Sequence, residues 1–388
     1  MLRKILAVMM VLAASLAGTV PVFAQGNPSG SSNGAVYLMS NSASGNQVLA
    51  YSRAADGSLD YTGTYATGGL GSGVGATVPP DPLGSQNSII ISPDGSMVFA
   101  VNAGSNEISS FQVTVDGLRL ADRASSAGTY PVSLTYSDGL LYALNAGGDG
   151  NITGFKVDGK AHLHSIQNST RSLHAATPDI GSQPNILEAP AQVGFSPNGN
   201  FLIVTDKGAV SGVGKIDVFR VDDGKPSAAP AITQTAGPVP FAFSFDRSGN
   251  LVVVDAAAGS VTSYAIAKNG NLSVLDTAFT GQAATCWIGT AGRYIFTDNT
   301  GSGSISGFSA APSGKLTPVT ASSIVVTTGA GSLPLDMGVS RDGRYIYSLE
   351  TGLGAVGIYH VQPDGSVTAL GTAAPFPAIG GFQGIAVR

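Results

Sequence analysis

The chain has 388 residues and few charged side chains. Hydrophobic residues make up 43% of it and charged residues 11%, about half of the roughly 25% usual in soluble domains. The formal net charge is −5. Because an acidic, lysine-poor surface repels polyanions, this composition argues against nucleic acid or an anionic membrane as a partner. The single cysteine, Cys286, excludes an internal disulfide.

Residues 1–24 are typical of a secretory signal peptide. Two basic residues precede an apolar run over residues 5–20, and residues 22–24 form a small-residue cleavage motif. The apolar run is short for a spanning helix, and no cysteine nearby could carry a lipid. We therefore expect a secreted or periplasmic protein without membrane attachment after cleavage. Residues 25–33, rich in Gly, Ser and Asn, should form a flexible leader to a domain over residues 34–388.

From there the chain repeats one short pattern seven times: an apolar strand, a terminal Asn, Asp or Glu, a Gly-rich turn and a second strand. In one clear copy, a Ser-Pro-Asp-Gly turn at 92–95 leads into a strand at 97–102, a turn at 103–106 and a strand at 107–111. A repeat of roughly 40–50 residues built only from strands predicts an all-β fold, a seven-bladed β-propeller. The strand-end positions are Asn41, Asn102, Asn145, Asp206, Asp255, Asp298 and Glu350.

The two ends of the chain indicate how the ring closes. The first repeat starts directly with the strand at 35–41, without a preceding strand or turn. Residues 382–387 read like the innermost strand of a blade, as residues 191–196 do. We therefore expect the C-terminal strand to complete the first blade, which would leave no open edge.

Several motifs suggest cofactors or metals without the context those sites need. Residues 352–357 match the Gly-x-Gly-x-x-Gly dinucleotide pattern, but a strand follows where the phosphate-binding helix would have to start. His162, His164 and His360 lack companion ligands at metal-site spacing. The sequence therefore predicts no cofactor and no metal, and it predicts Cys286 as a buried small hydrophobe.

Candidate site residues come from the propeller geometry, because equivalent strand ends gather around one mouth of the central channel. Asp206 and Lys207 place two charges where other repeats have Asn-Ala. Arg171 lies in the crossing from the third to the fourth blade and could reach the mouth to grip a carboxylate. These three are the catalytic candidates. The substrate-binding candidates are His174, Gln192, Gln86, Asp298 and Glu350.

A structural role is the alternative for each of them. A polar residue at the end of a strand can satisfy backbone groups of the following hairpin. Arg171 could equally be a loop arginine bound to backbone carbonyls.

The phrases at 92–106 and 195–199 resemble the seven-bladed lactonase family, which includes propeller 6-phosphogluconolactonases and carboxymuconate-lactonizing enzymes. The resemblance runs from residue 33 to residue 388. Within the family, the sequence resembles a secreted branch. It implies lactone chemistry at the channel mouth. The catalytic motifs of the family are not conserved in this sequence, however. Where the family typically has His-Pro-His, Pro-Arg-His and Asn-Glu, this chain has Ala-Pro-Ala at 189–191, Pro-Val-Pro at 238–240 and Asp-Ala at 255–256.

Two functions of different class remain. The first is a diverged hydrolase or cycloisomerase of carboxylate-bearing lactones, which would need a base for water and a cation for the developing oxyanion. The second is a non-catalytic extracellular propeller that binds a ligand or a protein. In both cases we expect a monomer, and for the first a lactone or organic acid as the small-molecule ligand.

Overall fold

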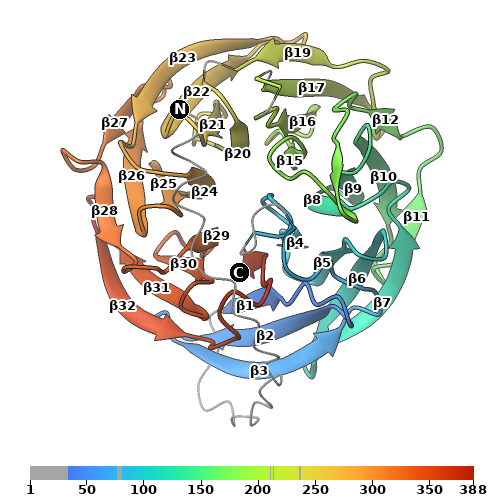
Figure 1. The fold of residues 1–388 in the computed structure, drawn as a ribbon, viewed down its shortest axis with the longest axis horizontal. Coiled ribbons are helices and arrows are strands. Elements are labelled where there is room, and N and C mark those ends of the chain that lie inside the picture. Colours follow the sequence, from blue (N-terminus) through green and yellow to red (C-terminus); the bar gives the residue numbers. More distant parts are fainter. Residues whose placement is uncertain (1–33, 77–80, 210, 213, 236) are drawn as a thin grey trace.

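The computed structural model describes residues 34–76, 81–209, 211–212, 214–235 and 237–388. The predicted signal peptide (1–24) and leader (25–33) lie outside these residues. The described chain forms a ring of seven antiparallel sheets around a central axis (Figure 1). The predicted seven-bladed β-propeller is therefore confirmed.

Each blade runs from an innermost strand at the axis to an outer strand at the rim, and every blade except the first is completed before the chain starts the next. The strands of the first three blades are, from the axis outward, β33 (Ile385–Val387), β1 (Gly34–Met39), β2 (Gln47–Arg53), β3 (Leu59–Ala66); β4 (Ile89–Ile91), β5 (Met97–Asn102), β6 (Glu107–Thr114), β7 (Gly117–Ser125); and β8 (Pro131–Ser137), β9 (Leu140–Asn145), β10 (Asn151–Val157), β11 (Leu163–Ser165) with β12 (Arg171–Ser172).

A small hairpin precedes the remaining four blades. Its two strands and those of the blades that follow are β13 (Asp179–Ile180), β14 (Gln183–Pro184); β15 (Pro190–Phe195), β16 (Phe201–Asp206), β17 (Lys215–Asp222), β18 (Lys225–Pro226) with β19 (Ala231–Gln234); β20 (Pro240–Phe245), β21 (Leu251–Asp255), β22 (Ser260–Ile266), β23 (Leu272–Phe279); β24 (Thr285–Ala291), β25 (Tyr294–Asn299), β26 (Ser304–Ala310), β27 (Leu316–Pro318) with β28 (Ile324–Thr327); and β29 (Pro334–Val339), β30 (Tyr345–Glu350), β31 (Ala355–Val361), β32 (Val367–Ala373).

The ring closes between the two ends of the chain, as predicted. The last strand, β33, pairs antiparallel with β1, with Ala386 opposite Tyr37. The first blade therefore has the order β3-β2-β1-β33. Neither end blade leaves an unpaired inner edge.

Burial follows the position of a strand within its blade. The second strands are continuous apolar runs because neighbouring blades cover both of their faces, and residues 251–254 of β21 are fully buried. Outer strands are half-exposed, and β3 alternates between partly buried and exposed positions. Aromatic rings fill the space between blades: Phe241 on β20 meets Trp287 on β24 edge to face at 5.0 Å.

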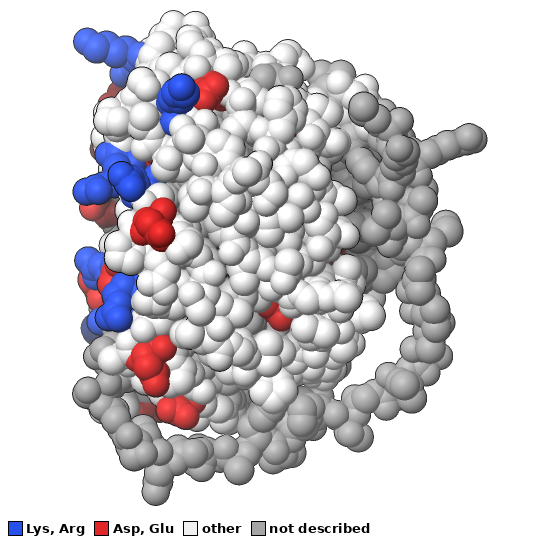
Figure 2. Space-filling model, turned by 90° about the vertical axis from the view of Figure 1, so that its left-hand side faces the viewer, with Lys and Arg blue, Asp and Glu red and all other residues white. Residues whose placement is uncertain are grey.

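The two flat faces of the ring differ in charge. One, which we call the charged face, carries the turns from innermost to second strands (such as 340–344) and from third to fourth strands (such as 54–58). The other, the crossing face, carries the turns after the strand-end residues and the crossings between blades (such as 126–130). In Figure 2, Lys, Arg, Asp and Glu gather along one edge of the ring, while its outer side is largely uncharged. Among the described residues, no helix is long and apolar enough to cross a membrane.

Candidate functional site

At the crossing face, residues 81–88 of the chain lie near the axis of the ring and form hydrogen bonds to four blades. We call this segment the channel plug; it leads from the crossing after β3 into β4, near the axis of the ring (Figure 1). Residues 81–86 are all buried. Lys207 Nζ donates to the carbonyl of Gly84 at 2.7 Å, and Trp287 Nε1 donates to the carbonyl of Ser85 at 2.8 Å. Lys207, one of the predicted catalytic residues, is therefore hydrogen-bonded to this buried segment.

Further hydrogen bonds connect the plug to other blades. Tyr130, before β8, donates from its hydroxyl to the carbonyl of Pro82 at 2.8 Å. Gln383, before β33, accepts from the amide of Leu83 at 2.8 Å. With Lys207 and Trp287, these contacts reach the first, third, fourth and sixth blades.

The two glutamines predicted to bind substrate instead pair with backbone. Gln86, within the plug, donates to the carbonyl of Ile288 at 2.9 Å and accepts its amide at 3.0 Å. Gln192 pairs in the same way with Phe243 in the next blade, at 3.0 and 2.7 Å. Both side chains are buried. Each side-chain amide thus holds its own segment to the innermost strand of another blade.

Asp206 and Lys207 are adjacent in sequence but face different surroundings. The Asp206 carboxylate lies 3.8 Å from Lys215 Nζ, within its own blade. Lys207 is buried against the plug, with its ammonium 5.1 Å from the centre of the Phe241 ring. Burial raises the pKa of Asp206 to about 7 and lowers that of Lys207 to about 8. In the plug, burial also raises the pKa of Asp81 to about 6, an effect that Lys207 opposes.

Arg171 lies at the outer part of the third blade and does not line the channel. It belongs to β12, which pairs with β10 on the outer side of the sheet, so the crossing to the fourth blade begins at the rim. His174 is exposed nearby, with its ring 3.3 Å from the Ser172 hydroxyl. In the structure, Arg171 is therefore a loop arginine bound to backbone carbonyls. Its guanidinium donates to four backbone carbonyls, those of Asn168, Thr170, Pro226 and Ser227.

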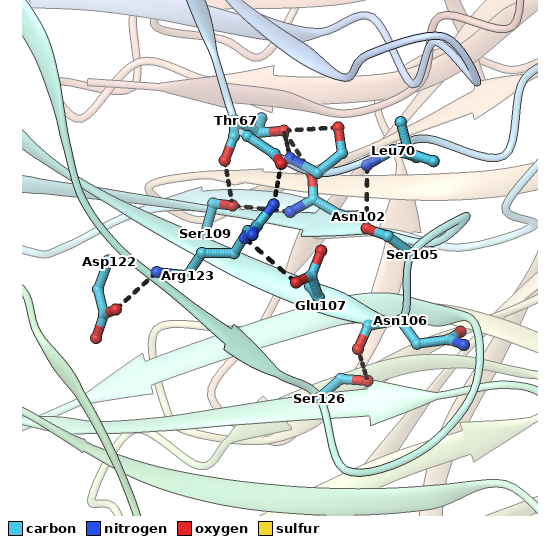
Figure 3. A network of polar contacts seen from close by, with 12 residues as sticks. Thr67, Leu70, Asn102, Ser105, Asn106, Glu107, Ser109, Asp122, Arg123 and Ser126 are labelled. Carbon is cyan, nitrogen blue, oxygen red and sulfur yellow. Dashed lines mark hydrogen bonds and ion pairs between the residues drawn. The ribbon is translucent and has the colours of Figure 1, made fainter.

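The strand-end residue Asn102 shows how such positions are used (Figure 3). Its Oδ1 accepts from the Thr67 hydroxyl at 2.7 Å and from Asn46 Nδ2 at 3.1 Å. Its Nδ2 donates to the Ser109 hydroxyl at 2.7 Å. The amide thus joins β5 to β6 and to the crossing that follows β3. It stabilises the blade and is buried away from solvent.

Asp298 and Glu350 are also buried. Asp298, which we predicted to be the strand end of the sixth blade, lies one residue before it. The strand end of the sixth blade is Asn299, which accepts from the Thr285 hydroxyl and donates to Ser304; Asp298 precedes it and points to the opposite face of the strand. Asp298 accepts from the Ser348 hydroxyl at 3.0 Å, and burial raises its pKa well above the usual value. Glu350 accepts from the Tyr359 hydroxyl, and burial raises its pKa to about 7.

Sequence reasoning missed residues of the plug and its partners, above all Asp81, Trp287 and Gln383. For Asp81 the only signal was the Pro- and Gly-rich composition of the segment before β4, which is typical of any loop. Trp287 and Gln383 lie in or next to innermost strands, where the sequence does not show that they contact this segment. Within the part of the chain that the structure describes, no three His, Cys, Asp or Glu side chains are arranged to hold a metal ion. Cys286, which we predicted to be buried, is partly exposed, and desolvation still raises the pKa of its thiol, which disfavours the thiolate.

Comparisons with solved structures agree with this architecture. A Bacteroides uniformis protein provisionally described as a 6-phosphogluconolactonase shares 18% identity, with a TM-score of 0.70 over 92% of this chain and 100% of that one. A Lactobacillus plantarum protein shares 14%, with a TM-score of 0.70 over 92% and 99%. The periplasmic gluconolactonase of Pseudomonas aeruginosa shares 18%, with a TM-score of 0.64 over 91% and 99%. The TM-scores establish a shared fold, and at identities this low the comparison shows the fold alone.

No curated protein matches the chain. The sequence does match the family described as "Lactonase, 7-bladed beta-propeller", over residues 30–177, 172–286 and 253–378. These segments together span most of the chain and all seven blades. The protein therefore belongs to the seven-bladed β-propeller lactonase family.

Proposed function

We propose that this protein is a secreted propeller of the lactonase family that binds a ligand without hydrolysing it. The observation that carries the proposal is the channel plug, which forms hydrogen bonds to four blades and binds Lys207 through the carbonyl of Gly84. A lactonase needs a base and a cation facing a space that admits the substrate. Here the candidate cation donates to the protein's own backbone. Secretion rests on the signal-like residues 1–24.

The residues around the mouth support the same proposal. The segments that enter the fourth and fifth blades read Ala-Pro-Ala at 189–191 and Pro-Val-Pro at 238–240, without imidazole or guanidinium. Arg171, our candidate for the substrate carboxylate, is held by carbonyls at the outer part of the third blade. Asp206 pairs with Lys215 inside its blade. Among the described residues, the three predicted catalytic side chains are thus each engaged by other groups of the protein.

One observation favours a second candidate, lactone hydrolysis after displacement of the plug. Asp81 and Lys207 have pKa values of about 6 and about 8, and such perturbed groups gather at catalytic sites. In that reaction the Asp81 carboxylate would take a proton from water as the water oxygen bonds to the lactone carbonyl carbon. The Lys207 ammonium would stabilise the oxyanion. The ring C–O bond would then break, and the proton would pass to the leaving oxygen.

The two candidates are separated by an assay of lactone ring opening. The chain from residue 25 onward is incubated with γ- and δ-lactones, with and without a carboxylate arm, and acid release is followed at pH 6, 7 and 8. We expect wild type, K207A and D81N all to match the buffer rate. Hydrolysis by wild type that is lost in K207A and D81N would refute the proposal in favour of the hydrolase. K268A, a change at an exposed lysine of a turn, is the matched control and must retain any such activity.

A further inference from the structure

The charged face carries an arginine surface over three consecutive blades and the closing strand. All of its arginines are exposed, and none forms an ion pair with a carboxylate among the residues that the structure describes. On a chain with a formal net charge of −5, such an unpaired group of cations is not explained by the average composition. Its members are Arg247, Arg293, Arg341, Arg344 and Arg388.

Two of these arginines line a cleft between the fifth and sixth blades. The cleft has a volume of about 460 Å³, within the range of about 300–1,000 Å³ that small-ligand sites occupy. Arg247 and Arg293 contribute two guanidinium groups, and no carboxylate belongs to the lining. The rest of the lining consists of hydroxyl-bearing and small side chains: Ser248, Ser309, Ala310, Ala311, Pro312 and Thr317.

The arginine on the sixth blade is held in place but keeps most of its donors. Arg293 Nη2 donates to the Tyr294 hydroxyl at 2.7 Å, and its guanidinium lies 4.9 Å from the centre of that ring. The Tyr294 hydroxyl in turn donates to the carbonyl of Pro363 in the seventh blade at 3.0 Å. Because a guanidinium has five N–H donors, several remain for a ligand. Arg247, on the other side of the cleft, forms no hydrogen bond within the described residues, which leaves all its donors available.

The acidic neighbour of Arg247, Asp246, forms no ion pair with it among the described residues. The Asp246 carboxylate accepts from the backbone amides of Ser248 and Asn250 at 2.8 and 3.0 Å. It also accepts from Asn250 Nδ2 at 2.8 Å, and it is buried in its turn. The carboxylate therefore serves the turn, and the arginine beside it points its charge at solvent and the cleft.

We propose that this cleft binds an oxyanion carried on a polyhydroxylated body, such as a sugar acid or a sugar phosphate. Arg247 and Arg293 would hold the oxyanion from two sides, because the planar guanidinium matches carboxylate and phosphate oxygens in two-point contacts. The Ser248, Ser309 and Thr317 hydroxyls would pair with hydroxyl groups of the body. The inference rests on the ligand-binding function proposed above and places the ligand on the face opposite the channel plug.

A second cleft on the same face provides an internal comparison. It lies between the seventh and first blades, has a volume of about 520 Å³ and contains Arg344 with His360. Unlike the first cleft, it also contains a carboxylate, that of Asp56. Arg344 lies 5.5 Å from the centre of the Tyr345 ring, much as Arg293 lies over Tyr294. Because only one arginine faces an acid there, we expect no comparable binding.

Isothermal titration calorimetry at low salt tests the proposal with three probes. Glucuronate and glucose 6-phosphate separate a carboxylate from a phosphate on the same kind of body, and glucose is the neutral control. We expect at least one of the two anions to bind and glucose not to bind. R247A and R293A should each weaken that binding about ten-fold or more, whereas R344A should leave it within about two-fold. All three positions are exposed, so circular dichroism should report unchanged folding.

The outcomes that would overturn the inference are equally specific. Absence of binding for both anions at 10 mM, equal binding of glucose, or undiminished binding in R247A and R293A would each refute it. A weakening in R344A equal to that in R293A would show general attraction to a cationic face and would also refute it. Hydrolysis of lactones in the earlier assay would remove the non-catalytic function but would leave this binding result to stand or fall separately.

Discussion

Replacing Glu350 with glutamine tests whether buried carboxyl groups make this propeller more stable in acid. Burial raises the pKa of Glu350 from 4.5 to about 7 in the folded protein. The protonated form is thus favoured by folding, and its contribution is present at low pH and lost as pH rises through about 7. With these two pKa values, linkage gives a loss of about 2.5 kcal/mol between pH 5 and pH 8. In E350Q the amide oxygen can still accept from the Tyr359 hydroxyl, so this loss should disappear.

The measurement is the free energy of unfolding in urea at pH 5, 6, 7 and 8. The stability of E350Q relative to wild type should rise by about 2.5 kcal/mol from pH 5 to pH 8. E107Q, which removes a carboxylate paired with Arg123 at the surface, is the matched control and should keep the wild-type slope. An E350Q slope equal to that of wild type would refute the reasoning.

Three further predictions concern closure, the plug and the polar strand ends. Deletion of residues 381–388 removes β33 from the first blade, so cooperative unfolding followed by circular dichroism should be lost; an unchanged transition would contradict ring closure. K207M leaves the buried Gly84 carbonyl without its charged donor, and urea unfolding at pH 7.5 should show a loss of about 2 kcal/mol, absent in the surface variant K268A. N102A breaks three buried side-chain hydrogen bonds and should lower the free energy of unfolding by about 2–3 kcal/mol, against less than about 0.5 kcal/mol for an exposed Ser44→Ala.

The fold was predictable because it depends on a period, and a period is visible in one sequence. Strand ends recurring every 43 to 61 residues fixed the number of blades, and the likeness of residues 382–387 to an inner strand fixed the closure. Local ambiguity produced the error at the sixth blade. Asp298 and Asn299 are both polar, and a shift of one residue sends a side chain to the opposite face of a strand.

The candidate site was less predictable because it depends on contacts between blades. Whether residues 81–88 lie over the ring or enter it is decided by partners such as Lys207 and Trp287, which are more than a hundred residues away. The sequence allowed Arg171 either to reach the mouth or to bind backbone carbonyls in its loop, and only the pairing of β12 with β10 places it at the outer part of the blade. The Arg247–Arg293 cleft had no sequence signal, since single arginines in turns are common.

The plug changes how the ring should respond to damage. In a ring whose blades touch only their neighbours, loss of one blade would be felt mainly next door, as in linear repeat proteins. Residues 81–88 instead connect blades that are not neighbours, because they form hydrogen bonds directly to blades on opposite sides of the ring. A fault in the first or the sixth blade is thereby transmitted across the diameter. For the same reason, new chain ends made by circular permutation should be tolerated in outer turns but not within residues 81–88.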